Sequence, residues 1–190
     1  MNKQGILIVC ALEIETQGQL DDWNVLYTGV GKVNATFKLA QKLFRSYIPY
    51  DLVINYGTAG SRKYQQGELV DCTKFVKRDM DVTGLGFIKY QTPFENDIPI
   101  QLDYDHVDFN PIGKKALCGS GDSFVQDETV GDVVDMESYA LAKVCRSYDV
   151  PFISFKYITD GADRDANTDW GKNASKGIIK FKEKILGLVK

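Results

Sequence analysis

Apolar runs that end in turn residues alternate along this chain with stretches of helical periodicity. Three runs are almost continuously apolar, which is typical of strands buried on both faces: 6–11, 52–56 and 152–159. Shorter strands are expected at 25–28 and 117–119, and a longer, partly exposed strand at 68–76. The pattern between about 79 and 110 is irregular and indicates loops with short strands.

Three stretches show the 3.6-residue period of amphipathic helices. The first, 32–47, has an apolar face of Val33, Phe37, Ala40, Phe44 and Tyr47. The second, 134–148, aligns Glu137, Leu141, Val144 and Tyr148, so a carboxylate falls in line with a buried stripe. The third predicts a closing helix with Ala174, Ile178, Phe181, Ile185 and Leu188 on one face.

This alternation predicts a single α/β domain over residues 1–190, with a mainly parallel sheet covered on both faces. Ligand sites in such sheets lie outside the carboxyl ends of the strands. Distinctive residues follow three expected strands: Glu13 and Glu15, then Gly57-Thr58-Ala59-Gly60, then Asp160. We therefore expect carboxylates, a small hydroxyl and free backbone donors to gather at one edge of the sheet.

Composition and charge narrow the function classes. Hydrophobic residues make up 44% and charged residues 26%, and the net charge of −3 gives no field that would attract nucleic acid or an anionic membrane. The first apolar run is too short to span a bilayer, and Glu13 and Glu15 follow it where a signal cleavage site would lie. A cytoplasmic protein with neither nucleic acid nor membrane as a partner is expected.

The cysteine and histidine content argues against redox and metal chemistry. The four cysteines share no CxxC spacing, which predicts buried, reduced thiols. The single histidine, His106, gives little support to a histidine metal site or a Ser-His-Asp triad. No metal or other cofactor is expected.

One glycine motif, Gly29-Val30-Gly31-Lys32-Val33-Asn34, nearly matches the dinucleotide fingerprint. Asn34 takes the place of the third glycine, and Asp51 precedes its strand instead of ending it. A tight turn between strand and helix is therefore favoured over nicotinamide binding, and no Walker A sequence occurs.

Candidate chemistry lies in the acids at the sheet edge and in one aromatic residue. A carboxyl like Asp160, backed by apolar neighbours, can have a raised pKa and donate a proton, although a simple turn aspartate is the alternative. At most one of Glu13 and Glu15 is expected in the site; solvated loop acids are the alternative. Glu137 on an apolar stripe needs a partner, and a sugar diol would use both its oxygens. Phe124 suits stacking on a flat ring, and an ordinary core phenylalanine is the alternative.

Several ordered motifs resemble the 5′-methylthioadenosine/S-adenosylhomocysteine nucleosidases of the nucleoside phosphorylase superfamily. Three of them are Ser-Gly-Asp-Ser-Phe-Val at 120–125, Val-Asp-Met-Glu-Ser at 134–138 and Ile-Thr-Asp-Gly-Ala-Asp at 158–163. Segments 27–35, 53–60 and 79–83 match in the same order, so the resemblance covers essentially the whole chain. It implies a three-layer α/β/α domain on a mixed, partly barrel-like sheet, a homodimer, and hydrolysis of an N-glycosidic bond that releases adenine.

The resemblance also implies roles for individual residues. Asp160 matches the acid that protonates purine N7, and Glu15 the base that deprotonates the attacking water. Glu137 and Met136 match the pair at the ribose, Phe124 the ring that stacks on adenine, and Val125 the residue whose backbone meets the adenine edge. Thr58 and Lys156 fall near the water, and Trp170 falls where an aromatic closes over the 5′ side. Val30 and Ser123 lie in matched motifs and are further substrate-binding candidates. Val82, Leu85 and Pro93 match residues lent by the dimer partner to the 5′ pocket.

Departures from the family pattern leave alternatives open. Lys156 stands for an arginine, Asp135 for a glutamate and Leu85 for a phenylalanine, and the segments before Gly29 and between Pro93 and Leu117 are shortened. Glu15 would repel phosphate and no arginine directly precedes Thr58, so hydrolysis is favoured over phosphorolysis. A purine nucleoside phosphorylase and a catalytically weak nucleoside-binding protein remain the alternatives.

Overall fold

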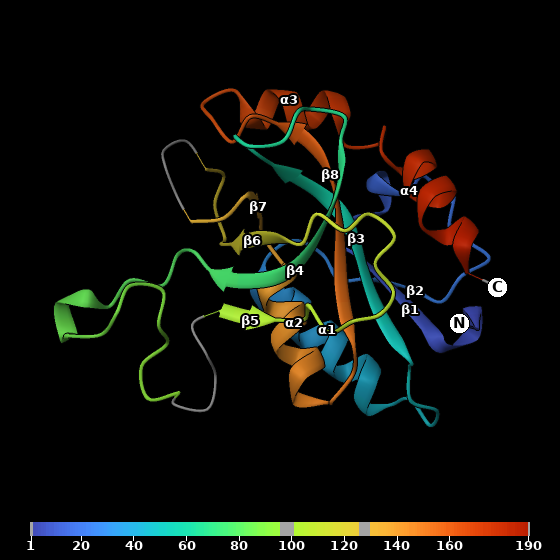
Figure 1. Cartoon of the computed structure of the whole chain (residues 1–190), viewed down its shortest axis with the longest axis horizontal. Helices are drawn as coiled ribbons and strands as arrows, with labels where there is room; N and C mark the ends of the chain where they lie inside the picture. The colour runs from blue at the N-terminus through green and yellow to red at the C-terminus, as the bar shows by residue number, and fades with distance from the viewer. Residues whose placement is uncertain (1, 96–100, 126–129, 190) are drawn as a thin grey trace.

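The computed structural model describes residues 2–95, 101–125 and 130–189, and its strands form one mixed sheet. The strands are β1 (Ile6–Cys10), β2 (Val25–Tyr27), β3 (Leu52–Gly60), β4 (Leu69–Lys77), β5 (Gln101–Asp103), β6 (Ala116–Ser120), β7 (Val133–Asp135) and β8 (Phe152–Asp160). The order along the sheet is β2-β1-β3-β7-β6-β4-β5, and β8 pairs with both β3 and β4 (Figure 1).

Five of these strands close into a ring. β3 pairs with β8, β8 with β4, β4 with β6 and β6 with β7, and β7 returns to β3 through the pairing of Gly60 with Val134. β1 and β2 extend the sheet in parallel from β3, and β5 adds to β4 in antiparallel fashion. The expectation of an α/β fold on a mixed, partly barrel-like sheet is confirmed.

Helices cover both faces of the sheet. α1 (Lys32–Phe44) and α2 (Ser138–Ser147) lie together below it in Figure 1, while α3 (Ala166–Asn173) crosses its top and α4 (Ile178–Lys184) lies at its side. Single turns of 3₁₀-helix occur at η1 (Lys3–Gly5), η2 (Glu13–Glu15), η3 (Thr83–Leu85) and η4 (Leu186–Leu188). In the described part of the chain, no helix is both long and apolar enough to cross a membrane.

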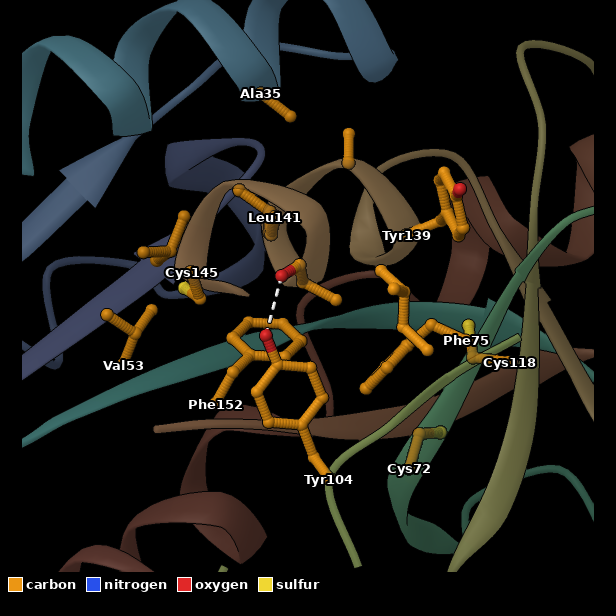
Figure 2. Close-up of a cluster of buried hydrophobic side chains, with 14 of the residues drawn as sticks. Ala35, Val53, Cys72, Phe75, Tyr104, Cys118, Tyr139, Leu141, Cys145 and Phe152 are labelled. Atoms are coloured by element: carbon orange, nitrogen blue, oxygen red, sulfur yellow. Dashed lines mark hydrogen bonds between the residues drawn. The ribbon is translucent and has the colours of Figure 1, made fainter. Parts of the chain in front are cut away.

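The core has one cluster on each side of the sheet. Figure 2 shows the cluster toward α2, where Phe75, Tyr104 and Phe152 meet ring to ring and the Tyr104 hydroxyl donates to the Ala142 carbonyl at 2.7 Å. On the other side, Tyr56 stacks on Phe181 of α4 with ring centroids 4.4 Å apart. All four cysteines are buried and free, as the sequence predicted.

The predicted apolar face of α1 is wrong. Its buried residues are Ala35, Leu39 and Leu43, whereas four of the residues predicted for that face are exposed: Val33 (78%), Phe37 (60%), Phe44 (81%) and, after the helix, Tyr47. The helix carries apolar residues on two stripes, and the one with the smaller side chains packs against the protein. The stripe with the larger side chains is left uncovered in the single chain.

Two element boundaries and the burial of one strand also differ from the expectation. Residues 133–135 pair as β7, so α2 begins only at Ser138, and Glu137 precedes the helix as its N-cap residue. The closing helix predicted around 174–188 is reduced to α4 and the single turn η4, α3 ends just before it, and Leu188 is exposed. The strand expected to be partly exposed, β4, is mostly buried because it is one of the strands of the ring, paired with β6 on one side and with β8 on the other.

Candidate active site

A cavity of about 250 Å³ opens at the edge where β1, β3 and β8 end. These strands run parallel, so the segments that follow them converge, as the sequence predicted. Eleven of the fourteen predicted site residues line the cavity: Glu15, Val30, Thr58, Ser123, Phe124, Val125, Met136, Glu137, Lys156, Asp160 and Trp170. The three others, Val82, Leu85 and Pro93, do not line it.

Glu15 enters the cavity from the single turn η2 and is almost fully buried (3% exposed). Its Oε1 accepts hydrogen bonds from the Thr58 backbone N–H (2.8 Å) and hydroxyl (2.9 Å), and its Oε2 accepts from the Leu12 N–H at 3.1 Å. One buried carboxylate therefore receives three hydrogen bonds. Glu13, by contrast, is exposed.

Asp160 closes β8 at the opposite wall and is 5% exposed. The Thr159 hydroxyl donates to its Oδ2 at 2.8 Å and the Ala162 N–H to its Oδ1 at 3.0 Å. A Cβ on Gly60 would lie 2.3 Å from this carboxylate, so only glycine permits the approach. Burial raises the pKa of Asp160 above its ordinary value, and the two hydrogen bonds only partly offset this effect. A buried carboxyl with a raised pKa is suited to donate a proton.

Glu137 lies in the bend between β7 and α2, where it is 8% exposed. Its Oε1 accepts a hydrogen bond from the Gly31 N–H at 2.8 Å. Burial and, to a smaller extent, the negative charge of Asp135 raise the pKa of Glu137 to about 7, although Lys156 and the Gly31 N–H act in the other direction. Met136, beside it, is partly buried and lines the same wall.

Beneath this wall, Lys156 Nζ lies 2.8 Å from Asp135 Oδ2, and both side chains are at most 2% exposed. Asp135 also accepts from the Ser120 hydroxyl (2.5 Å) and from the N–H and hydroxyl of Ser138 (2.9 and 2.6 Å). Burial opposes the charge on Asp135, but Lys156 and these donors lower its pKa to about 2. Burial likewise opposes the charge on Lys156, but Asp135 holds its pKa above the ordinary value.

Sequence reasoning missed the residues that hold this pair. Asn55 Oδ1 accepts from the hydroxyls of Ser138 (3.0 Å) and Ser154 (2.7 Å), which places a connected polar layer between β3, β8 and α2. The available signal was the presence of Asn55, Ser154 and Lys156 inside otherwise apolar strand patterns, because buried polar groups need partners. In the described residues, no group of three or more His, Cys, Asp or Glu side chains could hold a metal ion.

The adenine-side candidates lie on the segment after β6. Phe124 is half exposed, while Val125 is buried. Arg78, a second residue that the sequence analysis missed, holds this segment: its guanidinium donates to the Gly121 carbonyl at 3.0 Å and also to the Ser123 carbonyl. The only sequence signal for Arg78 was its position just beyond the end of the expected strand 68–76.

Trp170 reaches the cavity from α3 and donates from Nε1 to the Thr58 hydroxyl at 2.9 Å. Val82, Leu85 and Pro93 lie on the long segment after β4, well away from the cavity lining, and Leu85 is 76% exposed. Within the single chain the structure therefore does not bring these three residues to the site.

Comparison with known proteins identifies the family of the chain. The family model of the phosphorylase superfamily matches residues 123–190. A 5′-methylthioadenosine/S-adenosylhomocysteine nucleosidase of Anoxybacillus flavithermus is 30% identical, and the match covers 88% of this chain and 81% of that protein. The chain belongs to the 5′-methylthioadenosine/S-adenosylhomocysteine nucleosidase family. A nucleosidase of the same name from Staphylococcus carnosus is 29% identical over 92% of this chain and 85% of its own. The nucleosidases of this family are N-glycosyl hydrolases.

Solved structures show the same fold. A mutant Helicobacter pylori nucleosidase with 5′-methylthioadenosine in its active site superposes with a TM-score of 0.81 at 20% identity, covering 98% of this chain and 99% of that one. A mutant futalosine hydrolase from Helicobacter pylori gives a TM-score of 0.80 at 20% identity, covering 96% and 98%. These likenesses extend the nucleosidase fold to the present chain.

Proposed function

We propose that the chain hydrolyses the N-glycosidic bond of 5′-substituted adenosines, with a 5′-thio group preferred, to adenine and a ribose derivative. The observation that carries the proposal is that two buried carboxyl groups in one cavity have different environments. Asp160 has a raised pKa, and Glu15 accepts hydrogen bonds from three donors. Two acids in separate environments can act as proton donor and proton acceptor in glycoside cleavage.

Asp160 is the proposed general acid. Adenine leaves poorly as an anion, so protonation at N7 lowers the barrier to breaking its bond to the ribose. The 6-amino group of the purine lies next to N7 and can donate to the other carboxyl oxygen. Phe124 would stack on the base, and the Val125 backbone would meet its edge, with Ser123 and Val30 completing this side of the pocket.

Glu15 is the proposed base for the attacking water, with Thr58 and Lys156 nearby. An ionised carboxylate also stabilises the positive charge that develops on the ribose as the bond breaks. Lys156 is already paired with Asp135 at 2.8 Å, so its charge is not free to bind phosphate, and Glu15 would repel that anion. Hydrolysis is therefore favoured over phosphorolysis.

Glu137 and Met136 are proposed to hold the ribose. In the free protein Glu137 uses one oxygen to accept from the Gly31 N–H, and a ribose diol would bring it two further donors. Hydrogen bonds to the charged form would offset the burial that raises its pKa to about 7.

The 5′ side is proposed to be completed by Trp170 and by a second copy of the chain. Val82, Leu85 and Pro93 would reach the partner's cavity, which explains why they lie outside the cavity of their own chain. The uncovered stripe of Val33, Phe37 and Phe44 on α1 supports such a homodimer, because large exposed apolar side chains mark protein interfaces. Residues 1–190 would act as one cytoplasmic domain that needs no cofactor.

The deciding experiment is adenine release from a panel of 5′-substituted adenosines in phosphate-free buffer. We expect adenine and the matching ribose derivative without added phosphate, with 5′-thio substrates turned over fastest. Release only after phosphate is added would support a nucleoside phosphorylase instead. Tight nucleoside binding without turnover would support a nucleoside-binding protein.

A further inference from the structure

A chain of hydrogen bonds connects helix α3 with the carboxylate of Glu15. The indole Nε1 of Trp170 lies 2.9 Å from Thr58 Oγ1, and that hydroxyl lies 2.9 Å from Glu15 Oε1. Trp170 comes from the helix that crosses the carboxyl end of β8, whereas Thr58 lies on β3, which pairs with β8 (Figure 1).

The chemistry of the indole fixes the direction of the first bond, and in the structure the Thr58 hydroxyl donates the second to Glu15. An indole N–H can only donate, so the Thr58 hydroxyl must accept from Trp170. The single proton of the hydroxyl is then directed at Glu15, which also accepts from the Thr58 N–H at 2.8 Å. In this arrangement Glu15 Oε1 accepts from both the hydroxyl and the backbone N–H of Thr58.

We propose that Trp170 is a positioning residue that acts through Thr58 on Glu15 and so holds the base for the attacking water in place. This inference rests on the proposed role of Glu15. Trp170 itself need not touch the water. Its contribution is to hold the Thr58 hydroxyl in one orientation, with its proton toward the carboxylate.

The N–H of the indole, and not only its ring, is required by this inference. A phenylalanine at position 170 would keep an aromatic surface over the cavity but would leave the Thr58 hydroxyl free to rotate. The hydroxyl proton could then turn away from Glu15, so the carboxylate would lose a fixed hydrogen-bond donor. The same loss would follow from Thr58→Val, which removes the hydroxyl.

The first test measures kcat/KM for adenine release against pH in the wild type and in Trp170→Phe. We expect the acidic limb of the profile to move to higher pH by about half to one unit in the variant, on the scale of one weakened charge-assisted hydrogen bond. In a Thr58→Val background, Trp170→Phe should add no further movement, while Thr58→Ser should resemble the wild type. An unmoved acidic limb in Trp170→Phe, or an equal movement in the Thr58→Val background, would overturn the inference.

A second test does not depend on activity. The chain has two tryptophans, so Trp23→Phe leaves Trp170 as the only one. In Trp23→Phe, we expect the fluorescence of Trp170 to change in one step as the pH is lowered and the carboxylates of the cavity take up protons. That step should disappear in Trp23→Phe/Glu15→Gln and in Trp23→Phe/Thr58→Val. A step that persists in both double variants, or that is absent from Trp23→Phe, would contradict the link. If the wild type released no adenine, the proposed function would fail while this measurement still decided the link.

Discussion

Lys156 and Asp135 form an ion pair in the floor of the cavity, with 2.8 Å between Nζ and Oδ2 and with side chains 2% and 1% exposed. The pair lies between two further carboxylates, since Lys156 acts on the pKa of Glu137 and approaches the same face of Gly57 as Glu15 does. Its ammonium is thus the positive charge that allows several acids to share one cavity. Both partners lose hydration on burial, so each depends on the other.

Replacing only one partner of this ion pair should strongly destabilise the protein. Lys156→Met leaves Asp135 as a buried, unpaired charge, which costs about 3–5 kcal/mol in other buried pairs. The double variant Lys156→Met/Asp135→Asn should lose less than the sum of the two single variants, because no uncompensated charge remains. Urea unfolding of the four proteins measures this coupling directly.

The matched control is the pair of Lys63 and Asp132, which has the same 2.8 Å separation but side chains 56% and 31% exposed. Lys63→Met should change the unfolding free energy by less than about 1 kcal/mol, because water already screens this pair. Equal losses at the two pairs would show that burial does not govern the stability of the Lys156 pair.

The sheet edge that forms the cavity could be predicted because it depends on local pattern alone. The predicted strands before Glu13, Gly57 and Asp160 are continuous apolar runs, and the ends of neighbouring parallel strands meet at a common edge. The residues that follow these runs therefore predict that Glu15, Thr58 and Asp160 lie together at that edge. The ring closure through β7 was not predictable in this way, because β7 has only three residues and pairs with β3 at a single position.

The face of α1 could not be predicted because periodicity shows that a helix is amphipathic, not what covers it. Both stripes of α1 are apolar, and the one with the larger aromatic residues remains exposed. The polar layer of Asn55, Ser138 and Ser154 was missed for a similar reason, since its members come from three distant segments. Only tertiary packing shows that they meet.

Asp160→Asn should nearly abolish adenine release and leave the fold intact. Asparagine keeps the shape of the side chain but cannot donate a proton to N7, and general acid catalysis typically contributes about 10²–10⁴-fold. Turnover should fall by that range, while the melting temperature changes little. Asp163→Asn removes a charge from the same loop without removing the donor, so its turnover should stay close to wild type. A comparable loss in both variants would point to loop geometry instead of proton donation.

Glu137 should make the stability of the protein depend on pH near neutrality. Its folded pKa is raised from 4.5 to about 7, so the protonated folded form carries no penalty at low pH, and the penalty grows as pH rises from about 4.5 through about 7. The wild type should therefore lose stability relative to Glu137→Gln over this window, by at most about 3 kcal/mol. Urea unfolding of both proteins at pH 5, 6, 7 and 8 measures the difference. A constant difference would show that Glu137 titrates at the same pH in the folded and unfolded chains.

Phe37→Asp should weaken self-association and, through it, activity. Phe37 lies in the middle of the exposed stripe on α1 and is 60% exposed in the single chain. Burying a phenylalanine contributes about 1.5–3 kcal/mol, so a charge at its place should raise the dimer dissociation constant by at least about 10-fold. Sedimentation velocity over a range of protein concentrations measures this constant. Lys38→Gln, at the adjacent exposed position, changes the net charge by the same amount and should leave it unaltered.

The activity of Phe37→Asp separates a dimer that completes the site from one that is only structural. If Leu85 and its neighbours enter the partner's cavity, specific activity should fall at low protein concentration and recover as concentration rises, because mass action restores the dimer. Leu85→Asp should lower activity at every concentration, since its dimer would form but present a charge to the 5′ pocket. Full activity of a monomeric Phe37→Asp protein would contradict the shared site and leave Trp170 as the residue that closes the 5′ side.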